Sequence, residues 1–370
     1  MALSERAGFW TAASVAGLAL WASGAPTVVY TLYAEEWQLQ PSVTTAIFAI
    51  YPIVLVPVLI VFGNLSDVIG RRAVILMGLA ALTAGSIAFG LAPDLTWVFF
   101  GRALMGVGVG LSLSPATAAM VEFGGRDGAR RASSATTAAT ATGLALATIV
   151  GGFAFFLPRH TRDETAGPWR PRLPRTPREE RAAFTAGTLG ISAAFAMGAI
   201  FLALGAQIAR DLVRSDNAFV NGAIISISAV TIGVVAVVAR PLRPRTAVTL
   251  GPVLAIVGLG LLIVAGLGHS LPAFIASSLV AGAGYSLMFS GGLGLVTSSA
   301  PAHHRAAVIS AAYVVGYLVQ AVAALGLGVL ATTSGLQVAL ELGAPIILLL
   351  GVAALVVANT ARWRVPVAAT

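Results

Sequence analysis

Long apolar stretches recur along almost the whole chain, and they constrain the fold more than any other feature. Of the 370 residues, 58% are hydrophobic and only 10% are charged, whereas soluble domains carry about 25% charged residues. A bilayer core about 30 Å thick needs about 20 mostly apolar residues per helix. Many of the stretches reach that length. The sequence therefore predicts an all-α polytopic membrane protein rather than a soluble protein with one large core.

Eleven of these stretches are expected to form transmembrane helices. A cleaved signal peptide has an apolar core of only about 7–15 residues, so the longer first stretch is expected to stay as an uncleaved span. Pro and Gly inside the spans are tolerated because neighbouring helices satisfy the freed backbone groups. The predicted spans are 8–33, 43–64, 73–92, 96–121, 132–157, 182–209, 217–239, 246–268, 271–299, 306–333 and 337–361.

The kinds of charged and reactive residue exclude several classes of function. All 22 basic residues are Arg, and they fall mostly in short loops, so the net charge of +8 indicates membrane topology rather than nucleic-acid binding. The chain has no cysteine, which excludes disulfides, zinc–thiolate sites and iron–sulfur clusters. Patterns typical of acyltransferases, serine hydrolases and zinc proteases are missing from the sequence. We therefore expect neither an enzyme nor a cofactor or metal site.

The distribution of Arg among the loops predicts which side of the membrane each loop faces. Loops 65–72 and 122–131 are rich in Arg, whereas loops 34–42 and 93–95 contain acidic residues and no Arg. Loops rich in Arg face the cytoplasm. We therefore expect a multi-pass protein of the cell membrane with both termini in the cytoplasm.

The middle of the chain conflicts with this simple topology. Segment 158–181 contains seven Arg and five Pro, which favours a cytoplasmic linker, yet an odd number of spans precedes it. Either the second half is inserted upside down, or the linker crosses between the two faces without being a normal helix. The predicted division is an N-terminal bundle of five spans at 1–157, an Arg/Pro-rich linker at 158–181 and a C-terminal bundle of six spans at 182–370.

The two halves also resemble each other in sequence. Gly106-Val107-Gly108 resembles Gly282-Ala283-Gly284, and Arg130-Arg131-Ala132 resembles His304-Arg305-Ala306, at offsets of 176 and 174 residues. Agreement in order and spacing indicates an internal repeat. Repeated bundles around a cavity at the membrane midplane are typical of secondary transporters.

The segment between the second and third spans carries the most specific motif. It reads Gly63-Asn64-Leu65-Ser66-Asp67-Val68-Ile69-Gly70-Arg71-Arg72 and resembles the signature loop of the major facilitator superfamily, in which position 68 is usually basic. The resemblance implies a fold of two helical bundles, and a cytoplasmic gate formed by Gly63, Asp67, Gly70, Arg71 and Arg72.

Each residue of this gate motif has a physical interpretation. Gly63 would let a neighbouring helix approach closely, and Gly70 would permit a tight turn. Asp67 would accept hydrogen bonds from a helix N-terminus or pair with an Arg of the other half. In the alternative interpretation, Arg71 and Arg72 only anchor the topology.

Arg102 is a basic residue inside a predicted span. A charge within the membrane is costly and points to function by default. Arg102 and Gly106 resemble the R-x-x-x-G motif of the family's fourth helix. Contact with a substrate or coupling ion is one interpretation, and a structural hydrogen bond to backbone at a helix break is the other.

Two further comparisons with the family show departures. Gly151 and Gly152 end the fifth span where antiporters of the family read G-P-x-x-G-G, but Ala147-Thr148 replaces Gly-Pro here, so the two glycines can equally be close-packing residues. The chain then runs directly into the segment that normally follows the sixth helix, which implies that this peripheral helix is missing.

The family lines its cavity with spans one, two, four and five and with their equivalents in the second half. Polar and aromatic residues there are candidate substrate contacts, although each can also be a packing or interfacial residue. Tyr313 and Tyr317 share one helix face. The candidates are Thr27, Tyr30, Tyr51, Thr140, Gln207, Asn221, Tyr285, Phe289, Tyr313, Tyr317 and Gln320.

No coupling residue can be assigned from the sequence. Proton coupling usually needs a carboxylate or His inside the membrane. Glu341 is the only acid within a predicted span and is expected near the outer surface, while the His residues fall in loops. A coupling proton or ion is a candidate partner without an assigned site.

These observations favour a secondary active transporter that moves a small organic molecule or drug-like compound by alternating access, as in efflux. The expected partners are a small-molecule substrate and the lipid bilayer, and not nucleic acid. The alternative is a degenerate or truncated homologue that retains the fold and does not transport, an interpretation supported by the missing helix.

Overall fold

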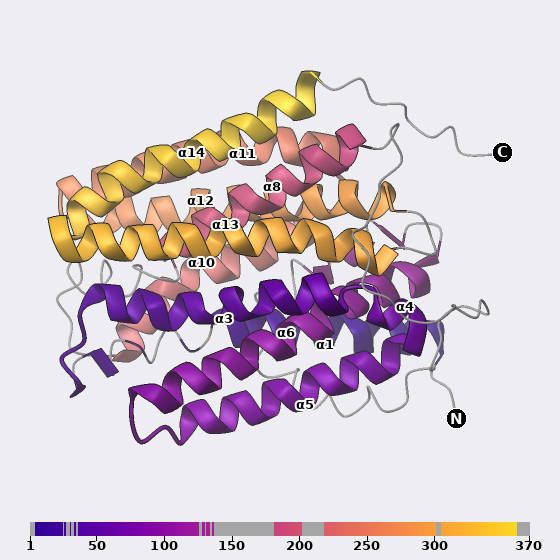
Figure 1. The fold of residues 1–370 in the computed structure, drawn as a ribbon. Helices are drawn as coiled ribbons and strands as arrows, with labels where there is room; N and C mark the ends of the chain where they lie inside the picture. The colour runs from indigo at the N-terminus through magenta and orange to yellow at the C-terminus, as the bar shows by residue number, and fades with distance from the viewer. Residues whose placement is uncertain are drawn as a thin grey trace.

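The chain folds into long, roughly parallel helices (Figure 1). The computed structural model describes residues 4–24, 26, 30, 33–34, 36–125, 128–129, 131–133, 135–136, 181–201, 218–300 and 305–360. Helices joined by turns and short loops make up this part of the chain. The helices of the first half are α1 (Glu5–Gly24), α3 (Pro41–Phe62), α4 (Leu65–Ile69), α5 (Arg71–Gly90) and α6 (Leu95–Phe123). Those of the second half are α8 (Arg181–Ala199), α10 (Ala218–Val238), α11 (Pro244–Leu267), α12 (Leu271–Ser298), α13 (Arg305–Ser334) and α14 (Leu336–Thr360).

Eight of the described helices are long and apolar enough to cross a membrane: α3, α5, α6, α8, α11, α12, α13 and α14. Each coincides with a predicted span, and α10 coincides with the predicted span 217–239. The polytopic all-α fold is thereby confirmed. The total of eleven spans is not established, because most of the predicted fifth span, 132–157, lies outside the described residues.

The first predicted span, 8–33, contains a break in its helix. α1 ends at Gly24, Pro26 follows in a turn, and Tyr30 and Tyr33 are again helical. Proline has no backbone N–H, so it cannot donate the helical hydrogen bond to the carbonyl four residues earlier. That carbonyl belongs to Ala22. The break at Pro26 frees a buried backbone acceptor within the membrane, and such a group needs a partner from elsewhere in the fold.

The internal repeat is visible in the glycines that allow close helix packing at equivalent positions of the two halves. A Cβ on Gly108 of α6 would approach Gly78 O of α5 to 2.7 Å, and a Cβ on Gly284 of α12 would approach Gly251 O of α11 to 3.0 Å. The pairs α5–α6 and α11–α12 are the most extensive helix contacts of their halves. Without a hydrophobic driving force between helices in lipid, small residues allow the close packing that holds them together.

Both halves have the same orientation. A Cβ on Gly8, near the start of α1, would lie 2.9 Å from the Phe123 ring at the end of α6. Ser310, near the start of α13, bonds to Gly63 beside α4. α14 runs back from the far end, and its last turns pack through Ala358 near the starts of α8 and α11. In Figure 1, α4 and the end of α14 lie on the same side. An upside-down second half is therefore excluded.

Candidate functional site

The turn between α3 and α5 is built around a buried arginine. Gly70 has a φ of 95°, a backbone conformation that favours glycine. The turn directs Arg71 inward, where its exposed fraction is 5%. Arg71 Nη1 donates to Ser66 Oγ at 2.7 Å and pairs with Asp67. Arg72 follows as a partly exposed residue at the start of α5.

Arg71 also ties this turn to the end of α6. Its Nη2 donates to Glu122 Oε1 at 3.0 Å, and the Glu122 side chain is only 5% exposed. Arg71 thus lies between two carboxylates of its own half. The ion pair described for Asp67 is with Arg71, four residues later in the same turn. Glu122 was not among the predicted site residues, although it is the only acid in the final turns of α6, directly after the predicted fourth span.

We predict that Glu122→Gln lowers the free energy of unfolding by about 1–3 kcal/mol, because a charged hydrogen bond to buried Arg71 becomes a neutral one. Glu341→Gln is the matched control. Glu341 Oε1 accepts from Gln337 Nε2 at 3.0 Å in an exposed pair, and its substitution should change stability by less than about 0.5 kcal/mol. SDS titration of the purified protein measures both variants. Equal effects would contradict a structural role for the Arg71–Glu122 pair.

Arg102 provides the partner that the break in α1 requires. Its side chain is fully buried, and its Nη1 donates to the freed carbonyl of Ala22 at 2.9 Å. Its Nε donates to Ile47 O of α3 at 3.3 Å. The guanidinium carbon lies 4.7 Å from the centre of the Tyr51 ring, a distance at which the ring face attracts a cation. The structure thus favours the structural interpretation of Arg102.

Gly106 lies one helical turn after Arg102 and faces the same part of α3. A Cβ at this position would overlap the carbonyl oxygen of Tyr51. Arg102 and Gly106 therefore contact Ile47 and Tyr51, two positions that are also one turn apart. This R-x-x-x-G pair fixes the crossing of α6 over α3 and places the Tyr51 side chain toward the second half.

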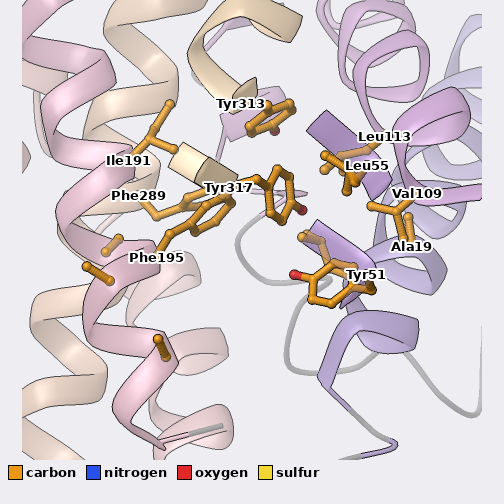
Figure 2. Close-up of a cluster of buried hydrophobic side chains, with 14 of the residues drawn as sticks. Ala19, Tyr51, Leu55, Val109, Leu113, Ile191, Phe195, Phe289, Tyr313 and Tyr317 are labelled. Carbon is orange, nitrogen blue, oxygen red and sulfur yellow. The ribbon is translucent and has the colours of Figure 1, made fainter. Parts of the chain in front are cut away.

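Aromatic side chains meet between the two halves. Tyr317 of α13 lies between Phe195 of α8 and Tyr51 of α3 (Figure 2), with ring centres 4.6 Å and 5.9 Å away. Tyr51 Oη donates to Gln320 Oε1 at 3.0 Å, also across the halves. Phe289 of α12 and Tyr313 of α13 complete the central part. We call this set, which also contains half-buried Tyr285 of α12, the aromatic cluster: Tyr51, Phe195, Tyr285, Phe289, Tyr313 and Tyr317.

Two hydroxyl groups of the aromatic cluster are buried without a hydrogen-bond partner in the described part of the chain: those of Tyr313 and Tyr317. The nearest side-chain oxygens are those of Thr117 and Tyr51, which donate to Leu113 O and Gln320 Oε1 and are not placed to accept a hydrogen bond from the two tyrosines. A buried hydroxyl without a partner costs about 1–3 kcal/mol. Such groups are suited to a ligand that supplies acceptors.

On either side of the aromatic cluster, α3 and α13 stay in contact toward both ends, along what we call the α3–α13 seam. At the α4 end, Ser310 Oγ of α13 bonds to Gly63 O, at the end of α3, at 3.2 Å, and also lies 2.9 Å from Ser114 Oγ of the neighbouring α6. At the other end, Ser42 N donates to Thr332 Oγ1 at 2.9 Å. There Gly328 leaves room for Thr45, whose Cβ lies 2.7 Å from the position that a Cβ on Gly328 would take.

The structure places the predicted cavity residues differently from one another. Tyr51, Tyr285, Phe289, Tyr313, Tyr317 and Gln320 are brought together in or beside the aromatic cluster. Tyr30 is buried in the first half instead, with its ring centre 5.9 Å from the Arg102 guanidinium carbon and 6.3 Å from the Phe89 ring centre. Asn221 belongs to α10, where its side chain is not described. Thr27, Thr140 and Gln207 lie outside the described residues, as do Gly151 and Gly152 of the predicted fifth-helix motif.

Phe195 was missed by the sequence analysis, although it contacts both Phe289 and Tyr317. The available signal was its spacing from Gly187 and Ile191. These three positions, four residues apart, form the face of α8 that packs on α12 and α13. Apolar residues at helical spacing are common in buried helices, so the pattern did not distinguish Phe195 from ordinary packing residues.

Comparison with known proteins agrees with this architecture. Residues 9–160 match the model of the Major Facilitator Superfamily. The chain is 32% identical over 210 residues to the multidrug efflux pump LfrA of Mycolicibacterium smegmatis, a match that covers 47% of this chain and 41% of the pump. It is 45% identical over 51 residues to polyol transporter 5 of Arabidopsis thaliana, covering 14% and 10% of the two chains. The matches span less than half the length of either relative.

The fold comparison extends over nearly the whole chain. The crystal structure of the human organic anion transporter MFSD10 (TETRAN) superposes with a TM-score of 0.67 at 14% identity, covering 95% of this chain and 100% of that one. At this identity the likeness concerns the fold. Residues 9–160 are thus similar to the Major Facilitator Superfamily by sequence, and the chain as a whole has the fold of the transporter MFSD10.

Proposed function

We propose that this protein is a secondary transporter that exports a small organic molecule across the cell membrane by alternating access. The observation that carries the proposal is the buried aromatic cluster between the two halves, with interfacial contacts on both sides of it. Similarity to a multidrug efflux pump supports export. Arginines lie at several helix starts on one side of the molecule: Arg71, Arg243, Arg245 and Arg305. Because Arg is enriched in cytoplasmic loops, these residues support cytoplasmic termini.

The chemistry of the α3–α13 seam suits a structure that opens at one end at a time. Outside the aromatic cluster, its contacts are a few hydroxyl hydrogen bonds and a small-residue contact at each end, Gly63 with Ser310 and Gly328 with Thr45, each worth about 1 kcal/mol or less net. Such contacts can be broken by rocking one half against the other. The Arg71 turn, held by Ser66, Asp67 and Glu122, keeps the first half rigid near one end of the seam.

Distances between pairs of spin labels test alternating access directly. Because the chain has no cysteine, pairs can be introduced without background. Gln40→Cys with Thr333→Cys reports the end of the seam near Thr332, and Phe62→Cys with Ala311→Cys reports the end near Ser310. In lipid nanodiscs, we expect each pair to show one short and one long distance between its labels. Conditions that increase the distance within one pair should decrease the distance within the other.

A single unchanging distance at both ends would favour the alternative, a homologue that retains the fold without transporting. The apparent absence of the sixth helix is the observation behind that alternative. Flux in proteoliposomes then distinguishes a protein that binds from one that transports. We assign no coupling ion: Glu341 lies in the second turn of α14 and bonds to exposed Gln337, away from the aromatic cluster.

A further inference from the structure

We infer that the aromatic cluster binds flat, uncharged aromatic molecules that carry hydrogen-bond acceptors. This inference rests on the proposed function, because it names the substrate class for that same site. Three independent observations lead to it: the common orientation of the rings, the two hydroxyls without partners, and the charge of the residues inside the predicted spans.

Three rings of the aromatic cluster are nearly parallel. The planes of Phe195 and Tyr313 differ by 10°, those of Phe289 and Tyr313 by 13°, and those of Phe195 and Phe289 by 22°. Their centres lie 5.5 to 6.5 Å apart. A flat ring system can lie parallel to all three rings at once, whereas a twisted molecule can match only one plane.

The hydroxyls of Tyr313 and Tyr317 give this surface its polarity. Both project from one face of α13, one turn apart, and both lack a partner in the described part of the chain. A hydroxyl is a donor that rotates to suit its acceptor. A carbonyl or ether oxygen on the ligand would satisfy one or both of them, which selects acceptor-bearing molecules over plain hydrocarbons.

The charge inside the predicted spans disfavours cationic ligands. Across all eleven predicted spans the sequence contains two ionisable charged residues, Arg102 and Glu341, and Glu341 lies near one end of α14. Arg102 lies against Tyr51, which in turn contacts Tyr317. A cation about 10 Å from Arg102 would be repelled by on the order of tenfold in affinity at an effective dielectric constant of about 20.

Equilibrium dialysis of the full-length protein in nanodiscs tests the inference, with empty nanodiscs as the blank. The probes are xanthone, which is flat, neutral and carries a carbonyl; benzophenone, which has the same carbonyl but twisted rings; and N-methylacridinium, which is flat and permanently cationic. We expect xanthone to bind at least about tenfold more tightly than either of the others.

Two variants identify the residues responsible. Tyr313→Phe with Tyr317→Phe should weaken xanthone binding by about tenfold, since up to two hydrogen bonds are lost. Phe195→Leu should remove most of the preference for xanthone over benzophenone. Tyr33→Phe is the matched control outside the cluster, where Tyr33 Oη bonds to Phe89 O at 3.3 Å, and should leave binding unchanged.

Specific outcomes overturn the inference. They are no saturable binding of xanthone by the unsubstituted protein, equal or tighter binding of benzophenone or N-methylacridinium, or an equal loss in Tyr33→Phe and the double variant. Failure of the proposed function is a separate result. The spin-label distances and flux can fail while xanthone binds selectively, and they can hold while this selectivity is missing.

Discussion

Replacing Arg102 with methionine should lower the free energy of unfolding by about 2–4 kcal/mol and abolish transport. Methionine has a similar length but cannot donate a hydrogen bond. The Ala22 carbonyl would lose the donor that replaces the missing N–H of Pro26, and the contact with the Tyr51 ring face would lose its cation. Unfolding by SDS, followed by circular dichroism, measures the change.

A double-mutant cycle with Pro26→Ala separates capping of this carbonyl from the other roles of Arg102. Alanine at position 26 restores a backbone N–H that can bond to Ala22 O. In this background Arg102→Met should cost about 1 kcal/mol less than in the unsubstituted protein. The entropic effect of removing proline from the unfolded chain cancels in the cycle. If the effects of the two substitutions are simply additive, Arg102 does not stabilise the protein by bonding to the Ala22 carbonyl that Pro26 leaves free.

Replacing Gly328 with alanine should force apart the end of the α3–α13 seam near Thr332. The new Cβ would overlap Thr45 Oγ1 and approach Thr45 Cβ to 2.7 Å. Overpacking of this kind costs about 1–3 kcal/mol, and separation of α3 from α13 at this end relieves it. The Gln40–Thr333 spin-label pair should therefore populate its long distance, while the Phe62–Ala311 pair remains short.

Gly326→Ala is a close control for this experiment. Gly326 lies two residues away on the same helix, and a Cβ there would meet nothing within 4 Å. Both substitutions gain about 1 kcal/mol of helix propensity, so a difference between them reports the contact with Thr45. Adding Thr45→Ala should partly restore the short distance, because Oγ1 and Cγ2 are removed while Cβ remains. Identical distances in the Gly326 and Gly328 variants would contradict the role of this contact in closure.

The helical membrane architecture was predictable because it depends on the composition of local stretches. A span must satisfy all its backbone groups internally, so a run of apolar residues such as 337–361 has few alternatives to α14. The turn within the predicted gate motif was recognisable for a related reason. Gly70 adopts a positive φ, and few residues other than glycine can occupy such a turn.

The interactions of charged side chains were less accessible from the sequence. Asp67 was expected to bind a helix N-terminus or an arginine of the other half, and neither expectation included the ion pair that it forms with Arg71 at i+4. Glu122 is 51 residues away from Arg71 in sequence and reaches it only because α5 and α6 pack side by side. Which residues meet at such a separation in sequence depends on where and at what angle two helices cross. The order of residues along one helix does not specify that crossing.

By itself the sequence determined the class of fold, most of the spans, the internal repeat and the residues that could form an interface. Pro26 and Arg102 were both visible, but only the tertiary structure decided that one frees the Ala22 carbonyl and the other binds it. The aromatic cluster shows the same division. Its tyrosines were recognisable as candidates, whereas the addition of Phe195 and the common orientation of the rings arise from packing between α8, α12 and α13. Helix formation is local, while the pairing of side chains across helices depends on a three-dimensional arrangement to which residues from the whole chain contribute.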